Sequence, residues 1–341
     1  MNLLTVSRLQ AYRRCPREER LRYQLGLRTE ATDALRFGTL IHRGLEAWWL
    51  ATEGERLRAA LAALTDTDDP FDRVRAECLL TGYDERWGAA DLKALAVEHE
   101  FRLPLLNPET GAESKTWQLA GKIDVIAVGP DGCVVIEHKT SSMDIGPGSD
   151  YIARLRLDGQ VSMYLRAARE LGHEPVGVLY DVLGKIALRP YQATPIELRK
   201  YTQEKIDKKT GAIVEPSRLY SNQRESDETI EEYRARVMEH IAANPDDYYQ
   251  RATVVRLEDE LREFERELWQ MGQVMRDAVR LEIAPRNPEA CSRYGSMCNF
   301  WPICSGEASV EAYQTGPIHP ELSEKPERGG SDERNSSAEV S

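Results

Sequence analysis

Three residues near the middle of the sequence have side chains suited to hydrolysis assisted by a metal ion: Asp124, Glu137 and Lys139. Glu137 and Lys139 are two positions apart, so on a strand they share one face. Asp124 belongs to the preceding predicted strand and can meet Glu137 across a short turn. Two adjacent carboxylates repel unless a cation lies between them, and oxygen ligands favour Mg²⁺ or Mn²⁺. Such an ion would polarise a phosphodiester, and Lys139 would orient the attacking water or stabilise developing charge.

Two further groups of polar residues accompany this motif. His42 precedes Glu46 by four positions, so both lie on one face of a predicted helix, where His42 is either a further metal ligand or a structural histidine. Gln160 and Tyr164 form a second such pair, directed at the reacting strand or at Lys139. The alternative for the whole set is a surface hairpin with an ordinary Glu–Lys pair, followed by half-buried polar residues on an amphipathic helix.

Four cysteines lie near the two ends of the predicted fold. Cys15 is in the N-terminal segment, and Cys291, Cys298 and Cys304 follow one another closely near the end. Disulfides are rare in reducing compartments, and four thiolates suit a [4Fe–4S] cluster or Zn²⁺. One early and three late cysteines do not match paired zinc knuckles and favour the cluster, which would join the two ends of the fold. The alternative is that the four cysteines are unrelated.

The other two cysteines, Cys78 and Cys133, lie in apolar segments and are predicted to be small core residues.

Apolar periodicity predicts the elements that must position these residues. Helices are expected over 7–25 with Ser7 as N-cap, and over 38–52, 55–64, 71–88, 158–171, 227–243 and 256–281. Strands are expected over 97–105, 117–128, 133–140 and 176–182, with a turn at 129–132. Strands and helices alternate, which predicts an α/β fold with a mixed central sheet flanked by helices. Residues 184–250 are predicted to be an insertion, and the acidic tail 306–341 to be disordered.

The composition limits the class of protein. The 341 residues carry 45 Lys and Arg against 57 Asp and Glu, a net charge of −12, which argues against a protein that coats nucleic acid generally. Residues 1–43 nevertheless hold nine Arg against four acidic residues, and Arg13, Arg14 and Arg17 are candidates for weak phosphate contacts. The start of the chain has no signal-peptide pattern and no apolar run long enough to span a membrane. A cytoplasmic protein of a bacterium, or of a phage in its host, is expected.

The order Gly38-x-x-x-His42, Asp124, Glu137-x-Lys139, Gln160-x-x-x-Tyr164 resembles the PD-(D/E)XK nuclease superfamily, and its RecB-like branch most. The resemblance covers about 1–305 as one nuclease domain, with a poor match in 184–250. It implies a restriction-endonuclease-like core in which His42, Asp124, Glu137 and the backbone carbonyl of His138 bind the metal. Lys139 would be the catalytic lysine, with Gln160 and Tyr164 supporting it. Ile123 stands where the motif has proline.

The cysteine pattern resembles that of the iron–sulfur nucleases, namely the AddB subunit and the CRISPR-associated spacer-processing exonucleases. The resemblance implies a [4Fe–4S] cluster on Cys15, Cys291, Cys298 and Cys304, although the six-residue spacing after Cys291 is longer than usual. Together with a likeness to phage-type exonucleases, it implies a Mg²⁺- or Mn²⁺-dependent DNA exonuclease acting on ends or single strands in recombination, repair, or phage or CRISPR DNA processing. A recombination or CRISPR-adaptation partner is expected. Two alternatives stay open: a DNA-end-binding subunit with a non-catalytic nuclease fold, and a zinc-stapled endonuclease.

Overall fold

The structure, a computed structural model, describes residues 1–322 except 66, 68, 208 and 294–295. Its contacts divide the chain into two compact units, which are described separately. Unit 1 contains Met1–Glu30, Glu100–Lys122 and Asp259–Ser341, and unit 2 contains Ala31–His99 and Ile123–Glu258. The long strands β3 (Lys93–Leu106) and β4 (Glu113–Gly129) contribute residues to both units.

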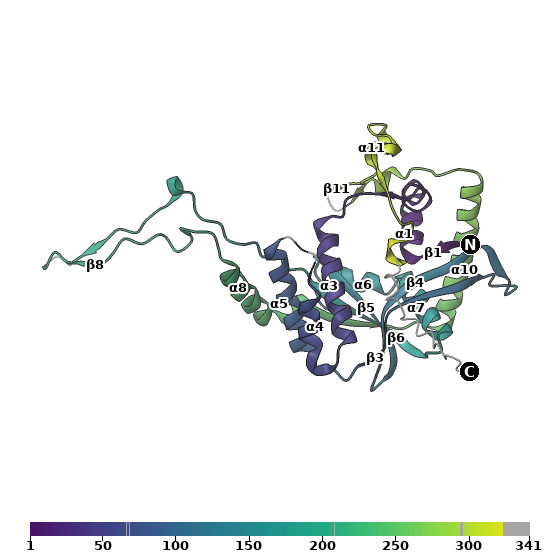
Figure 1. The fold of residues 1–341 in the computed structure, drawn as a ribbon, viewed down its shortest axis with the longest axis horizontal. Coiled ribbons are helices and arrows are strands. Elements are labelled where there is room, and N and C mark those ends of the chain that lie inside the picture. The colour runs from purple at the N-terminus through teal and green to yellow at the C-terminus, as the bar shows by residue number, and fades with distance from the viewer. Residues whose placement is uncertain (66, 68, 208, 294–295, 323–341) are drawn as a thin grey trace, which may run out of the picture. The chain divides into compact units, whose positions relative to one another are not determined.

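The fold is of the α/β type, with a mixed central sheet flanked by helices (Figure 1). Its strands are β1 (Asn2–Leu4), β3, β4, β5 (Gly132–Ser141), β6 (Pro175–Gly184) and β9 (Tyr249–Val254). The main helices are α1 (Val6–Arg14), α3 (Asp33–Leu50), α4 (Arg56–Ala62), α5 (Pro70–Trp87), α6 (Asp150–Leu155), α7 (Gly159–Glu170), α8 (Ile230–Ala243) and α10 (Glu258–Arg280). The strand order is β1-β4-β5-β6-β9, and β3 pairs with β4.

In unit 2 the second half of β4 and the whole of β5 form the predicted hairpin. Their antiparallel register runs from Gly129↔Gly132 to Val125↔Ile136. Asp124 and Glu137 lie one residue beyond this register, and the backbone N–H of His138 reaches the Asp124 carboxylate over 2.8 Å, so the two acidic residues are neighbours as the sequence predicts. Strand β5 then pairs in parallel with β6, and β6 pairs antiparallel with β9, so β5 is an internal strand with neighbours on both sides.

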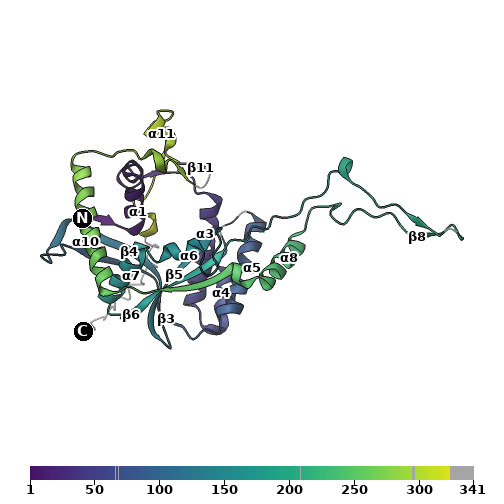
Figure 2. The ribbon, with the colours of Figure 1, turned by 180° about the vertical axis from the view of Figure 1, so that it is seen from behind.

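Four helices cover one apolar cluster of unit 2. Helices α3, α4, α5 and α8 supply most of its buried side chains, including Trp48, Leu79 and Tyr233. Helix α8 packs beside α5, as both views show (Figures 1 and 2). Thr229 caps α8 in a complete capping box with Glu232, which fixes where this helix begins. The core therefore holds α3, the helix of His42, against the sheet.

Unit 1 is organised around β1, the first half of β4 and α10. Strand β1 pairs in parallel with β4, with Leu3 opposite Gln118. The indole of Trp117 on β4 donates to the carbonyl of Gly272 on α10 over 2.8 Å. Gly272 permits this close approach, because a Cβ there would lie 2.9 Å from a methyl carbon of Leu105.

The N-terminal helix differs from its prediction. Its N-cap is Thr5 rather than Ser7, and α1 stops at Cys15 because Pro16 follows. A short helix α2 (Pro16–Glu19) and a π-helical turn (Arg20–Gln24) continue the segment. Proline has no N–H and clashes with the preceding turn, so the uninterrupted helix predicted over 7–25 is wrong. The break places Cys15 between two helices instead of within one.

The C-terminal segment also differs from its prediction over residues 306–322. Strand β12 (Gln314–Thr315) pairs with β2 (Leu27–Arg28), and Glu321 accepts a hydrogen bond from the Thr5 hydroxyl over 2.7 Å. These contacts join segments 286 to 316 positions apart in the sequence, so local composition did not reveal them. Residues 323–341, the remainder of the predicted tail, lie outside the described residues.

Only part of the predicted insertion 184–250 lies outside the core. Helix α8 packs in the apolar cluster and β9 is a strand of the central sheet, so both belong to the nuclease-like core. The segment between β6 and α8 forms a two-stranded ribbon that contains β7 (Lys205–Ile206) and β8 (Ile213–Glu215). Among the described residues, none of the helices has the length and apolar character needed to cross a membrane.

Candidate active site

Asp124 and Glu137 lie side by side in unit 2, both almost fully buried. Asp124 accepts a hydrogen bond from the backbone N–H of His138 over 2.8 Å, which fixes its carboxylate against β5. The His42 Nδ1 atom on α3 lies 3.8 Å from Asp124 Oδ2. Three residues that are distant in sequence, His42, Asp124 and Glu137, are thus neighbours at one end of the hairpin.

Glu137, Lys139 and Gln160 form a closed hydrogen-bonded triangle. Lys139 donates to Glu137 Oε1 over 2.5 Å and to Gln160 Oε1 over 2.8 Å. The Gln160 amide nitrogen donates to Glu137 Oε1 over 2.7 Å and lies 2.8 Å from the Tyr164 hydroxyl oxygen. Helix α7 positions Gln160 and Tyr164, and Asp158 caps its first turn by accepting from the Gln160 N–H. The i, i+4 spacing predicted this shared face.

The triangle occupies one oxygen of Glu137 and leaves the other without a protein donor. Among the described residues, the buried Glu137 Oε2 has no hydrogen-bond partner. A buried polar oxygen without a partner is costly and calls for a ligand. A hard cation held by the adjacent carboxylates would satisfy this atom, so the donor set fits Mg²⁺ or Mn²⁺. The described side chains of His, Cys, Asp and Glu nevertheless form no ready-made group of three or more that could hold a metal ion.

Burial sets the protonation of this site. It raises the pKa of Glu137 to about 7, and the nearby Asp124 charge adds to the rise while Lys139 opposes it. Burial alone would lower the pKa of Lys139, but the Glu137 carboxylate outweighs it and raises that pKa overall. Lys139 is therefore held as a cation, whereas Glu137 takes up a proton readily when no cation is bound.

A buried polar network behind the site escaped the sequence analysis. Asp181 on β6 accepts hydrogen bonds from the Tyr83 hydroxyl over 2.6 Å and from Arg251 over 2.9 Å. The ring of His138 lies 3.7 Å from Asp181, and burial lowers the pKa of His138 to about 3, so this ring is neutral. In the sequence, this network was signalled by Asp181, an acidic residue inside the apolar strand predicted over 176–182. The network thus lies against His138, the residue of β5 between Glu137 and Lys139.

Comparison with known proteins identifies the family of this chain. The family model of the PD-(D/E)XK nuclease superfamily matches residues 3–305. The chain belongs to this superfamily. Its members are typically nucleases that act on DNA, and they usually use Mg²⁺ or Mn²⁺. A solved structure described as "Crystal structure of SSO0001" is similar over 90% of this chain and 88% of that one, with 15% identity and a TM-score of 0.34. A search of curated proteins finds no match.

The four cysteines singled out in this PD-(D/E)XK chain line one small cavity of unit 1. Its volume is about 20 Å³, and Cys15, Cys291, Cys298 and Cys304 all border it. The backbone N–H of Cys298 donates to the Cys291 carbonyl over 2.7 Å, so the late cysteines belong to one compact loop. Within the described part of the chain, these cysteine side chains do not form a group placed to hold a metal ion. No disulfide joins them in the described structure, where all six cysteines are free.

Electrostatics disfavours thiolates in this cavity without a cation. Burial raises the pKa of Cys298, and the neighbouring Cys291 and Cys304 add to the rise. Burial likewise raises the pKa of Cys304, with Cys15 adding to the rise and Arg17 opposing it. A bound metal centre would reverse this shift, because it stabilises the deprotonated sulfur directly.

Cys78 and Cys133 lie elsewhere in this superfamily fold. Cys78 is fully buried in the apolar cluster of unit 2, and burial raises its pKa to about 11. Cys133 is half-buried on β5, and burial raises its pKa as well.

The three arginines predicted to contact phosphates all have partners within unit 1. Arg13 pairs with Glu267 at the surface, and Arg14 makes two hydrogen bonds to Glu18. Arg17 donates to the carbonyl of Ala284 over 2.8 Å. An exposed pair such as Arg13–Glu267 contributes little stability and exchanges easily for a phosphate. The role of these arginines in DNA binding stays a prediction.

Proposed function

We propose that this protein is a Mg²⁺- or Mn²⁺-dependent DNA exonuclease of the RecB-like branch, with a [4Fe–4S] cluster. The observation that carries the nuclease activity is the Glu137–Lys139–Gln160 triangle, in which Glu137 Oε2 has no hydrogen-bond partner among the described residues. The exonuclease mode, and a role in recombination, repair or CRISPR DNA processing, rest on the resemblance of the motifs. A protein partner from one of these pathways is part of the same proposal.

Each residue of the site has a distinct task in this proposal. Asp124, Glu137, His42 and the backbone carbonyl of His138 would hold the metal ion. When bound, the ion supplies a Lewis acid that polarises the phosphodiester and makes water a stronger nucleophile. Lys139, a cation at neutral pH, would hold the water or the developing phosphorane charge by hydrogen bonds. Gln160 keeps Lys139 directed at the site, and Tyr164 holds Gln160.

The cysteine cavity is the proposed cluster site. Cys15, Cys291, Cys298 and Cys304 would each provide one thiolate, the set that a [4Fe–4S] cluster requires. The cluster would have a structural role, because it joins α1 to the loop that follows α10. Closing so long a loop removes much conformational entropy of the unfolded chain, by the reasoning applied to disulfides.

An assay on end-labelled DNA tests the proposed activity. The purified protein is incubated with single- and double-stranded DNA labelled at the 5′ or the 3′ end, with Mn²⁺, with Mg²⁺ or with EDTA. Metal-dependent release of label from one end supports an exonuclease. Cleavage of circular DNA, included as a further substrate, would indicate an endonuclease instead. Binding of ends without cleavage under any metal condition would indicate the non-catalytic subunit.

Metal binding is expected to weaken at acidic pH. A proton and the metal ion compete for Glu137, whose pKa in the metal-free protein is raised to about 7. Mn²⁺ affinity should therefore fall about tenfold per pH unit below that value, with release of about one proton per ion. Calorimetry in buffers of different ionisation enthalpy measures both quantities. Equal affinity at mildly acidic and mildly alkaline pH, without proton release, would contradict the proposed role of Glu137.

His42→Ala is expected to impair Mn²⁺-dependent cleavage by about tenfold or more. Imidazole suits Mn²⁺ better than Mg²⁺, so activity with Mn²⁺ should fall more than activity with Mg²⁺. Initial rates over a titration of each metal measure this difference. A variant with a lower melting temperature and unchanged metal response would assign His42 a structural role.

A further inference from the structure

The proposed nuclease function assigns no role to the ribbon between β6 and α8. It comprises residues 190–228, here called the arm, and lies within unit 2 (Figure 1). Backbone hydrogen bonds join its two sides, from Thr194 to the Arg224 carbonyl and from Thr202 to the Arg218 carbonyl, both over 2.8 Å. Near the tip, Asp207 donates its N–H to the Ala212 carbonyl, and its side chain accepts from the following N–H groups. The arm is therefore a two-stranded ribbon with a closed tip.

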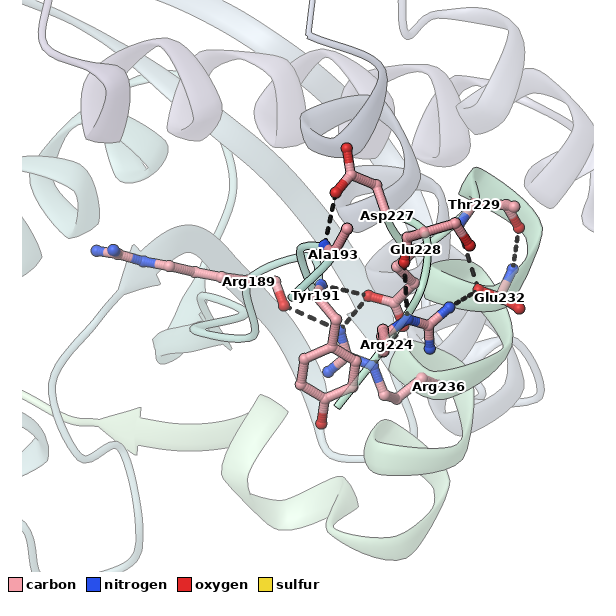
Figure 3. Close-up of polar contacts among 10 residues, drawn as sticks. Arg189, Tyr191, Ala193, Arg224, Asp227, Glu228, Thr229, Glu232 and Arg236 are labelled. Carbon is pink, nitrogen blue, oxygen red and sulfur yellow. Dashed lines mark hydrogen bonds and ion pairs between the residues drawn. The ribbon is translucent and has the colours of Figure 1, made fainter. Parts of the chain in front are cut away.

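The base of the arm is attached firmly to the core (Figure 3). The buried carboxylate of Glu228 accepts from the Tyr191 N–H and from two nitrogens of Arg236, and Arg236 also donates to the Arg189 carbonyl. The Arg236 guanidinium lies 4.0 Å from the centre of the Tyr191 ring. Arg236 belongs to α8, whose Tyr233 and Val237 are fully buried in the core. Since both sides of the ribbon meet this network, its base is positioned by the core.

The arm differs from the rest of the chain in its charge and in its exposed apolar side chains. Its outer part, residues 199–218, contains six Lys and Arg against three Asp and Glu, a net charge of +3, whereas residues 190–228 as a whole carry seven of each in a chain of net charge −12. Lys200, Lys209 and Arg218 are exposed. Apolar side chains are exposed beside them, among them Ile206 and Ile213, which pair across the ribbon close to its tip. An isolated two-stranded ribbon is marginally stable in water, so a partner that covers these faces would stabilise the outer part of the arm.

Charge identifies the class of that partner. Outside the arm the protein is strongly acidic, which repels a polyanion, so a DNA-binding member of this superfamily needs basic surfaces of its own. Of the three N-terminal arginines, Arg14 and Arg17 are engaged by Glu18 and the Ala284 carbonyl within unit 1, and Arg13 would exchange an exposed pair with Glu267 for one phosphate. A two-stranded ribbon fits the major groove of B-form DNA, where Lys and Arg reach phosphates and apolar side chains contact base edges. The major groove of A-form RNA is too narrow for this.

We propose that the arm, residues 190–228, binds double-helical DNA through Lys200, Lys209 and Arg218. This inference rests on the proposed nuclease function and specifies its substrate as DNA with a duplex portion. The buried Glu228–Arg236 pair holds the base of the ribbon so that the basic outer part is presented as one surface. Ile206 and Ile213 contact the groove beside the phosphates that the basic residues bind.

Binding without cleavage tests this proposal separately from the nuclease activity. The probe is a short fluorescent duplex, with the single strand of the same sequence for comparison, titrated in EDTA at several salt concentrations. The test protein is the full chain with Lys200→Gln, Lys209→Gln and Arg218→Gln. The control carries Lys93→Gln, Arg102→Gln and Lys115→Gln, which remove the same charge from exposed positions on β3 and β4. Both variants should melt within about 2 °C of the wild type, because all six positions are exposed.

The arm variant is expected to bind the duplex on the order of tenfold or more weakly than the wild type. The plot of log affinity against log salt should lose about 2 to 3 units of slope, since each lost phosphate contact removes about 0.9. The control should change neither quantity appreciably, and the single strand should be affected less than the duplex. A wild type that binds duplex in EDTA and does not cleave DNA when Mg²⁺ or Mn²⁺ is supplied would refute the nuclease function and leave the arm proposal standing.

Three outcomes would overturn the arm proposal. The first is unchanged duplex affinity in the arm variant, and the second is an equal loss in the control, which would indicate a general charge effect. The third is a change of oligomeric state in analytical ultracentrifugation with duplex affinity unaltered, which would make the arm a contact between copies of the protein.

Discussion

Asp124→Asn and Glu137→Gln are each expected to reduce DNA cleavage by on the order of 1,000-fold or more. Both substitutions keep the size of the side chain and remove the negative charge, so the metal would lose an anionic ligand while the hairpin keeps its shape. Asp124→Asn also weakens the hydrogen bond from the His138 N–H, because an amide oxygen is a poorer acceptor than a carboxylate. Initial rates on end-labelled DNA and Mn²⁺ titration of the same preparations measure both effects.

The hairpin offers a matched control for these variants. Asp131 lies in the turn that joins β4 and β5, exposed and at the opposite end from Asp124. Asp131→Asn should cleave at the wild-type rate. Lys139→Ala should lose most activity and still bind Mn²⁺, because Lys139 neighbours the ligands without being one. Near-wild-type turnover by purified Asp124→Asn or Glu137→Gln would refute the proposed site, and loss of metal binding in Lys139→Ala would assign the lysine a structural role.

Alanine substitution of any one of Cys15, Cys291, Cys298 and Cys304 is expected to cost the protein its iron–sulfur cluster. The four thiolates act as one ligand set, and three late ligands alone leave one iron open to solvent. Loss of the cluster should also reduce solubility and nuclease activity, because the start of the chain and the loop after α10 would no longer be joined through it. Iron and sulfide analysis of anaerobically purified protein, together with visible absorbance, measures the cluster directly.

Cys78→Ala and Cys133→Ala are the controls for the cysteine series. Cys78 is fully buried in the apolar cluster of unit 2, and Cys133 is half-buried on β5, so neither borders the cavity of the other four. Each should keep a full complement of iron and lose only about 1 kcal/mol of stability. A Cys15 variant that retains four irons would exclude Cys15 as a ligand. Zinc in place of iron and sulfide would establish the zinc-stapled alternative.

Where local geometry decides which side chains lie together, the sequence predicted those neighbours. Side chains alternate along a strand and recur every three or four residues on a helix, whatever the rest of the chain does. For this reason the pairing of Asp124 with Glu137 and the shared face of Gln160 and Tyr164 followed from spacing alone. The resemblance of the motifs then identified the superfamily, which the family match over residues 3–305 confirms. The metal, the cluster and the exonuclease mode stay predictions.

Contacts between distant segments were decided only by the tertiary structure. Nothing near Asp181 in the sequence indicates Tyr83 or Arg251 as its partners, because the folding of β6, α5 and β9 together selects them. The pairing of β12 with β2 and the internal partners of the three N-terminal arginines have the same origin. The elevated pKa of Glu137 likewise arises from burial, which depends on every element packed around the hairpin. Spacing along the chain therefore determined which side chains share a face, and packing determined their neighbours and their charge.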